Sequence, residues 1–185
     1  DAVDRLFFRR GYEADEDVGA LSDDLARVRT VPEVVATTLQ VLRGALWPRR
    51  AAILLRGADG AFASAAGSDF DVAGVVVSDA LELRCARGEI LARYEWDDGA
   101  EQVPPLWARL GAEIVVPLRH EGGAMALLAL DGKQSGRAYD NLDVAMLRTA
   151  AGQIGLALAT AAAFGQLESL NASLEERVRE RTAEL

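Results

Sequence analysis

Five side chains in the middle of the chain carry the functional groups best suited to binding a small molecule. They are Arg84, Cys85, Trp96, Trp107 and Arg109. Nearby arginines favour the thiolate form of a cysteine, and two tryptophans with an arginine can hold an anionic or aromatic ligand. The alternative is structural, because a lone cysteine among Leu and Ala is often a small core residue and tryptophan is largely buried on average. The sequence leaves both interpretations open.

The other reactive residues do not form a catalytic or metal-binding pattern. With one cysteine and one histidine, His120, the chain lacks a disulfide framework and the ligands of a cysteine-rich or two-histidine zinc site. It contains no nucleophile-elbow sequence and no GxxxxGK[ST] phosphate loop. His120 beside Glu121 predicts a solvated turn residue rather than a ligand, and the acidic residues Asp97, Asp98 and Glu101 predict a solvated loop. We therefore expect no catalytic residue and no metal site.

Charge and hydropathy narrow the classes of partner. The formal net charge is -9, whereas a nucleic-acid binder needs a basic stripe to displace counterions. No run of eighteen or more apolar residues and no signal-peptide pattern occurs, so we expect no membrane span in this stretch. The start at "DAVDRLFF" suggests a piece of a longer protein, and the single cysteine fits a reducing cytoplasm.

The helices and strands predicted along the chain occur in the order of an α+β fold. Helical periodicity covers residues 1–29, 30–46 and 78–87, and Thr30 with Glu33 has the spacing of a capping box. Apolar runs flank "GADG" and "RHEGG", which predicts two β-hairpins, and "GEILARY" predicts a further strand. This order predicts a central antiparallel sheet flanked by helices.

The chain is expected to close on one very long helix. Asp140 is a suitable N-cap, and an unbroken helix from there to the end would span about 45 residues, or roughly 67 Å. Its first half has apolar positions that can pack on the sheet. Its second half, which ends in "LEERVRERTAEL", extends beyond any core that a domain of this size can build.

Both terminal helices carry heptad-like seams, which are the pattern of helices that pair. The N-terminal seam is formed by Phe7, Gly11, Ala14, Val18, Leu21, Leu25 and Val28. The C-terminal seam combines two heptad positions, which hold Phe164, Asn171, Val178 and Leu185, and Thr160, Leu167, Leu174 and Arg181. The alternatives are an N-terminal helix packed on its own domain and a solvated single C-terminal helix. Since a short isolated helix is marginal in water, the C-terminal pattern favours pairing with a second copy.

The middle of the chain resembles a GAF domain. "VPEVVATTLQVLRGAL" followed by "RAAILLR" is similar to the opening helix and first strand of that family. "GAEIVVPLRHEGGAMALLALDGKQSGRAYDNLDVAMLRTAAGQIGLALATA" is similar to its closing hairpin and return helix. The resemblance covers about residues 20–163. The flanks "DRLFFRRGYE" and "LEERVRERTAEL" resemble the segments around sensor domains of bacterial histidine kinases.

The resemblance implies three parts: an N-terminal signalling helix over 1–29, a GAF-like sensor domain over 30–163, and a coiled-coil connector over 164–185 to an output domain. It implies a cytoplasmic homodimer that relays a signal, in a parent protein anchored in the inner membrane, to a histidine kinase core. The alternatives are a ligand-free structural spacer and the sensor of a diguanylate cyclase. Members that reduce free methionine sulfoxide need several cysteines, so we expect no enzyme activity here.

The family does not determine the ligand, because its members bind different small molecules or none. A bilin-binding member carries a cysteine, usually followed by a histidine, before the Val-Pro-Leu strand. The corresponding segment here is "QVPPLWARLGAE", which has neither residue. The resemblance therefore implies no covalent bilin, and it places the expected pocket between the sheet and residues 78–110.

Overall fold

The computed structural model describes residues 19–70, 72–96, 107 and 110–183. Five antiparallel strands form one sheet in the order β2-β1-β5-β4-β3. This arrangement confirms the predicted α+β class with a central antiparallel sheet. The strands are β1 (Ala51–Arg56), β2 (Phe62–Ser64), β3 (Leu91–Ala92), β4 (Ile114–His120) and β5 (Gly123–Leu130). The helices are α2 (Val31–Leu46), α3 (Asp79–Ala86), the short 3-10 helix η1 (Arg93–Trp96) and α5 (Asn141–Ala183), and residues 19–25 are also helical.

Both predicted hairpins are present, and both pair as their turn sequences require. β1 pairs with β2 across the "GADG" turn. β4 and β5 are joined at Glu121 and Gly122, whose φ angles of 48° and 87° are those of a two-residue type I′ turn. A register shift between Leu118 and Arg119 interrupts the ladder near this turn. The shift leaves Met125 of β5 without a partner in β4, which makes it a bulge in β5.

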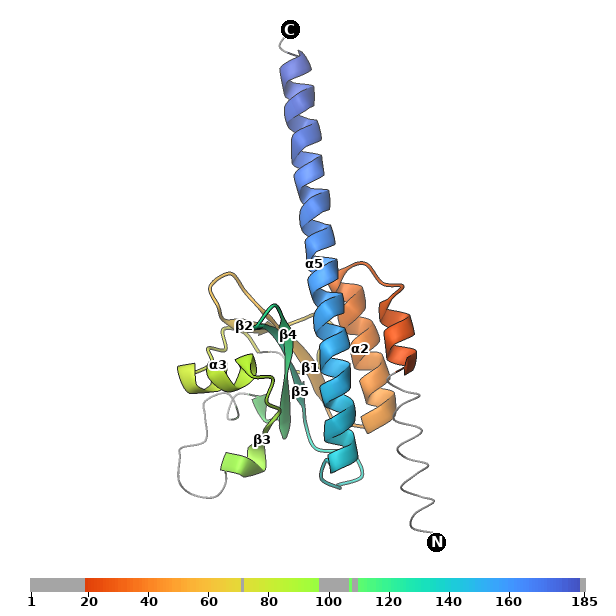
Figure 1. Cartoon of the computed structure of the whole chain (residues 1–185), viewed down its shortest axis with the longest axis vertical. Coiled ribbons are helices and arrows are strands. Elements are labelled where there is room, and N and C mark those ends of the chain that lie inside the picture. Colours follow the sequence, from red (N-terminus) through yellow and green to blue (C-terminus); the bar gives the residue numbers. More distant parts are fainter. Residues whose placement is uncertain (1–18, 71, 97–106, 108–109, 184–185) are drawn as a thin grey trace.

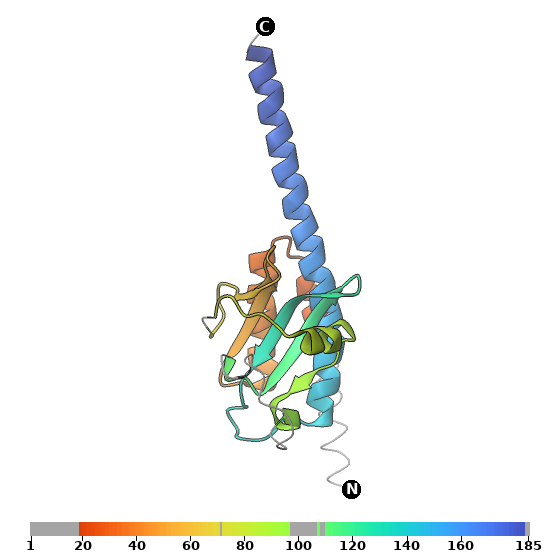
Figure 2. The same ribbon diagram turned by 90° about the vertical axis from the view of Figure 1, so that its left-hand side faces the viewer.

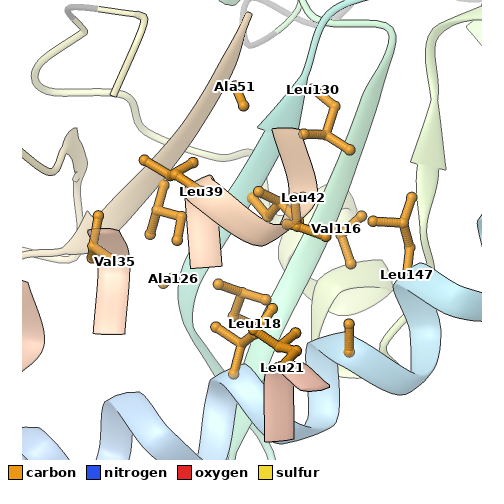
Figure 3. Close-up of a cluster of buried hydrophobic side chains, with 14 of the residues drawn as sticks. Leu21, Val35, Leu39, Leu42, Ala51, Val116, Leu118, Ala126, Leu130 and Leu147 are labelled. Carbon is orange, nitrogen blue, oxygen red and sulfur yellow. The ribbon is translucent and has the colours of Figure 1, made fainter. Parts of the chain in front are cut away.

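The sheet separates two layers (Figures 1 and 2). The helix at 19–25, α2 and α5 cover one face, and α3 with η1 lies on the other. Alternating strand residues therefore enter two separate cores, as in β1, where Ile53 points to the helical layer and Leu54 to the α3 layer. Figure 3 shows the helical-layer core, with Leu42 of α2 near Val116 of β4 and Leu21 near Leu118.

The capping box predicted for α2 is formed in both directions. The Thr30 hydroxyl accepts a hydrogen bond from the Glu33 N–H at 3.4 Å, and the Glu33 carboxylate accepts one from the Thr30 N–H at 3.0 Å. The carboxylate also accepts the Arg29 N–H, and these backbone hydrogen bonds lower the pKa of Glu33. Trp47 ends the helix in the left-handed region, with φ of 50°. The start of α2 is thus determined by local sequence.

α5 is a single helix of 43 residues, which corresponds to roughly 65 Å. The predicted N-cap is confirmed, because the Asp140 carboxylate accepts the N–H groups of Leu142 and Asp143 at 3.0 Å each. Its first half packs on the sheet through a buried face that includes Leu147, Ile154 and Leu158. From residue 163 to 182 every side chain is exposed, and the helix projects beyond the domain (Figure 1).

Length and composition alone would also allow α5 to cross a membrane. The most apolar part of the helix has a mean hydropathy of 1.3, and 39% of that window is buried inside the domain. A helix that packs one face on its own sheet meets the same criterion as a membrane span. We therefore assign the apolar character of its first half to core packing.

Two predicted elements are shorter than expected. The helix predicted over 1–29 ends at residue 25 in the structure, and its residues 1–18 lie outside the described part. A turn follows at residues 26–27, because the chain must reverse before Thr30 caps α2. The strand predicted for "GEILARY" is reduced to Leu91–Ala92, and the chain then turns into η1. The division into residues 1–29, 30–163 and 164–185 stays a prediction.

Candidate functional site

Arg84 is engaged inside the domain rather than presented to a ligand. Its guanidinium donates to Glu89 at 2.7 Å and to Glu95 at 2.8 Å, and these carboxylates raise the pKa of Arg84. The two contacts tie the end of α3 to η1 across the β3 segment. Arg84 therefore acts as a clamp between elements, and its place in a ligand pocket stays a prediction.

Cys85 is a core residue with a protonated thiol. It is buried among the side chains of the α3 layer, and this burial raises its pKa to about 11. Arg84 and Arg56 favour the thiolate, but desolvation outweighs them. Of the two interpretations that the sequence left open, the structure favours the core residue, because removal of the thiol from water raises its pKa more than the guanidinium charges lower it.

Trp107 belongs to the same core. It is 1% exposed and packs in the cluster that contains Phe62, Phe70 and Cys85. Its indole Nε1–H is buried without a hydrogen-bond partner among the described residues. Trp96 is the last residue of η1, whereas Arg109 lies outside the described part of the chain. The structure thus brings Arg84, Cys85 and Trp107 to one side of the sheet, with Cys85 and Trp107 in the same cluster.

The exposed half of α5 carries an apolar stripe on the side opposite its buried face. Leu167 and Leu170 are 60% and 56% exposed, and Leu156, Leu174 and Val178 are exposed as well. These positions continue the three-and-four spacing of a heptad seam. We call the residues Leu156, Leu167, Leu170, Leu174 and Val178 the α5 stripe.

The α5 stripe modifies the predicted C-terminal seam. Leu167, Leu174 and Val178 belong to both, whereas Leu156 and Leu170 were missed. Leu170 is adjacent to Asn171, which the predicted seam used in its place. Phe164 lies at the flank, where the Arg29 guanidinium stacks on its ring at 5.5 Å. The sequence signal for Leu156 was available, since it lies two heptads before Leu170.

Described residues of the N-terminal seam pack against the core of their own domain. Leu21 and Leu25 are buried in the helical-layer core, and Val28 packs against it (Figure 3 shows Leu21). The prediction of a self-associating seam is therefore wrong for Leu21 and Leu25, because the core of the same chain already covers them. Val18 lies outside the described residues.

A groove remains where the N-terminal helix meets α5. It encloses about 280 Å³ and is lined by Ser22, Leu25, Ala26 and Val28 on one side. Gln153, Leu156, Ala157 and Thr160 of α5 line the other side. Because Leu156 also begins the α5 stripe, the groove and the stripe form one continuous surface.

Three arginines that no sequence pattern connects lie around a second cavity, between β4 and α5. Arg87, Arg119 and Arg148 line one cavity, although they are far apart in the sequence. Their convergence depends on how the chain after α3 and the helix α5 pack beside β4. No local pattern in the sequence encodes that packing.

Taken together, the sheet, its two cores and the projecting helix define the class of a small α+β regulatory domain. The chain belongs to the GAF domain family, whose model matches residues 28–159. It is thus a signalling and sensing domain of the kind that sits in multidomain proteins with output domains. A search of curated protein sequences finds no match.

Solved structures confirm the fold. The GAF domain of a phosphoenolpyruvate-protein phosphotransferase from Coxiella burnetii is 14% identical, with a TM-score of 0.63, covering 84% of this chain and 98% of that one. The corresponding domain from Acinetobacter is 15% identical, with a TM-score of 0.61 and coverage of 83% and 98%. Residues 122 to 287 of a methyl-accepting chemotaxis protein are 21% identical, with a TM-score of 0.56 and coverage of 76% and 96%.

Proposed function

We propose that this GAF domain forms a parallel homodimer through α5 and relays a signal along that helix to an output domain. The output we favour is a histidine kinase core in a two-component system, with the domain on the cytoplasmic side of a membrane-anchored parent. The observation that carries the proposal is the α5 stripe, which lies exposed along a helix that leaves the domain.

The stripe has the chemistry of an interface rather than of a solvated surface. Burying one leucine side chain stabilises an assembly by about 1.5–3 kcal/mol, and the stripe presents four leucines and one valine on one side of the helix. Glu176 and Arg179 of the same segment pair at 3.3 Å on another side of the helix. A partner helix of the same sequence would cover the apolar positions and leave these charges in water.

The parallel arrangement follows from what the helix must reach. Residues 163–182 make a projection that no part of the described domain covers. Two such helices side by side would bring both C-terminal ends to the same place, as a shared output requires. An antiparallel pair would send them to opposite ends.

The seam also contains polar residues, which would allow a helix pair to change its packing. Thr160, Asn171 and Arg181 lie in or beside it, and polar seam residues weaken packing while specifying register. A helix pair of this kind can have two packings of similar free energy. A signal then shifts the balance only by its different affinity for the two packings.

Sedimentation equilibrium of the full 185-residue chain tests this proposal. We expect a dimer for the unchanged chain, and Leu170→Lys should weaken dimerisation at least tenfold, because it places a charge within the seam. Ala172→Lys is the matched control, since it adds the same charge two residues away on the opposite side of the helix. A monomer at high protein concentration, or equal effects of the two variants, would contradict the proposal.

One observation favours a second function, that of a dimeric spacer without a ligand. The face expected to bind a small molecule holds Cys85 and Trp107 as buried core residues. A thermal-shift screen with small metabolites separates the two functions, since a saturable response supports sensing and a flat response supports the spacer. The alternative output is a diguanylate cyclase, and an assay of the full-length parent distinguishes the two.

A further inference from the structure

The edge of the sheet beside α5 contains a cavity of about 260 Å³. β3 pairs with Val115 and Ile114, and no other described strand pairs with this side of β4. The chain after α3, β4 and α5 each contribute to the walls of the cavity. We propose that this cavity, at the sheet edge beside α5, binds a small dianionic molecule, either a phosphate ester or a dicarboxylate.

Positive charge is concentrated around this cavity, although the whole chain is acidic. The cavity is lined by Arg87, Arg119 and Arg148, while the chain carries a formal net charge of -9. Arg87 forms a long ion pair with the Glu89 carboxylate, at 3.8 Å. Within the described residues, neither Arg119 nor Arg148 forms a side-chain ion pair. Three guanidinium groups with few carboxylate partners in the protein favour the binding of an anionic ligand.

Arg119 gives the most direct indication of a missing partner. Its Nε is buried and has no hydrogen-bond partner among the described residues. A buried donor of a charged group costs free energy unless an acceptor satisfies it, and most such groups in folded proteins are satisfied. An oxyanion in the cavity would supply acceptor oxygens to a guanidinium, whose fork matches both phosphate and carboxylate.

The backbone holds Arg119 in place before any ligand arrives. Arg119 lies opposite the bulge at Met125 of β5, and Gly155 of α5 lies directly on the Arg119 backbone. On the outer side, Gly88 has a φ of 76°, and a Cβ there would lie 2.8 Å from Arg119 Nη1. Two glycines thus allow a helix and a turn to approach this arginine closely.

Size and wall chemistry limit the ligand. Pockets for drug-sized molecules usually enclose about 300–1,000 Å³, so this cavity suits a smaller metabolite. Apolar atoms of Ile90, Val116, Pro117 and Ala151 also line it. These walls can accept a short carbon skeleton while the arginines hold its charged groups.

The position of the cavity would let a ligand act on α5. A dianion that contacts both Arg119 of β4 and Arg148 of α5 would join the helix to the sheet edge across the cavity. The binding proposal does not depend on dimerisation, because all of its lining residues come from one chain.

Isothermal titration calorimetry of the full chain, at constant ionic strength, tests the proposal with inorganic phosphate and with succinate. We expect saturable binding of at least one anion, weakened about tenfold or more by Arg119→Gln and by Arg148→Gln. The matched control is Arg27→Gln, which removes the same charge from an exposed arginine paired with Asp24 outside this cavity. Circular dichroism checks the fold, and Arg148→Gln alone suffices if Arg119→Gln does not fold.

The outcomes separate clearly. Tighter binding of phosphate identifies a phosphate ester as the ligand class, and tighter binding of succinate identifies a dicarboxylate. Both results support the anion site. The absence of saturable binding for both anions overturns it, and so does equal weakening by Arg27→Gln and Arg148→Gln.

Discussion

Gly155 of α5 lies against the backbone of Arg119 in β4, so closely that a Cβ at position 155 would be 2.3 Å from the Arg119 carbonyl oxygen. The obstacle is backbone rather than a flexible side chain, so it cannot move aside cheaply. We expect Gly155→Ala to lower the free energy of unfolding by about 1–3 kcal/mol, which urea denaturation measures.

Gly165, ten residues further along the same helix, is the matched control. It is exposed, and a Cβ there would meet nothing within 4 Å. Gly165→Ala should therefore stabilise the helix by about 0.5–1 kcal/mol through its propensity alone. If both variants were stabilising, close packing of α5 on β4 would be contradicted.

The thiol of Cys85 should be unreactive until the domain opens. Its pKa is raised to about 11 by burial, so the thiolate is scarce at neutral pH and shielded from reagents. We expect labelling by Ellman's reagent at pH 8 to be slow, and to become fast at the urea concentration where the fold is lost. Fast labelling of the folded protein would show that the thiol is accessible.

The same pKa predicts a dependence of stability on alkaline pH. A thiol whose pKa is higher in the folded state contributes stability that is fully present below its unfolded pKa, near 9, and lost as pH rises through about 11. Cys85→Ala lacks this group. The difference in free energy of unfolding between the two proteins should therefore shrink between pH 9 and pH 11.

The capping box of α2 should contribute measurably to stability. Thr30→Ala removes the acceptor for the Glu33 N–H and should lower the free energy of unfolding by about 1 kcal/mol. Thr30→Ser, which keeps the hydroxyl, is the control and should lie close to the unchanged protein. An equal loss in both variants would mean that the hydroxyl is not the stabilising group.

Glu33 adds an acid dependence to the same cap. Its pKa is lowered by the N–H groups of Arg29 and Thr30, so its contribution is present above the unfolded pKa, near 4.5. It is lost as pH falls through the lower, folded value. The stability difference between the unchanged protein and Glu33→Gln should therefore disappear as the pH drops below this range in thermal unfolding.

The contacts of Arg84 should order the segment between α3 and η1. Arg84→Gln removes the charged partner of Glu89 and Glu95, and partly exposed pairs of this type contribute at most about 1 kcal/mol each. The clearer effect is local, with faster amide hydrogen exchange over residues 93–96. Arg84→Lys keeps one charge without the fork and should give an intermediate rate, whereas unchanged exchange in Arg84→Gln would contradict the clamp.

Local patterns were sufficient to predict the hairpins, the α2 cap and the N-cap of α5. Each depends on residues within a few positions of one another, such as Thr30 with Glu33 or Glu121 with Gly122. Their physical basis is a hydrogen bond or a backbone angle that the nearby residues decide alone. The length of α5 was predictable for the same reason, since no proline interrupts it after Asp140.

Only the tertiary structure determined which apolar helix faces are buried in the core and which residues distant in the sequence lie close together. Leu21 and Leu167 both follow seam spacing, yet one is buried in the core and the other is exposed, because helical period identifies a shared face but not its neighbour. Cys85 and Arg84 are adjacent, but burial rather than proximity determines the pKa of the thiol. Arg119 and Arg148 line one cavity because α5 packs against β4 at Gly155, and that packing depends on strand register and helix placement across the whole domain.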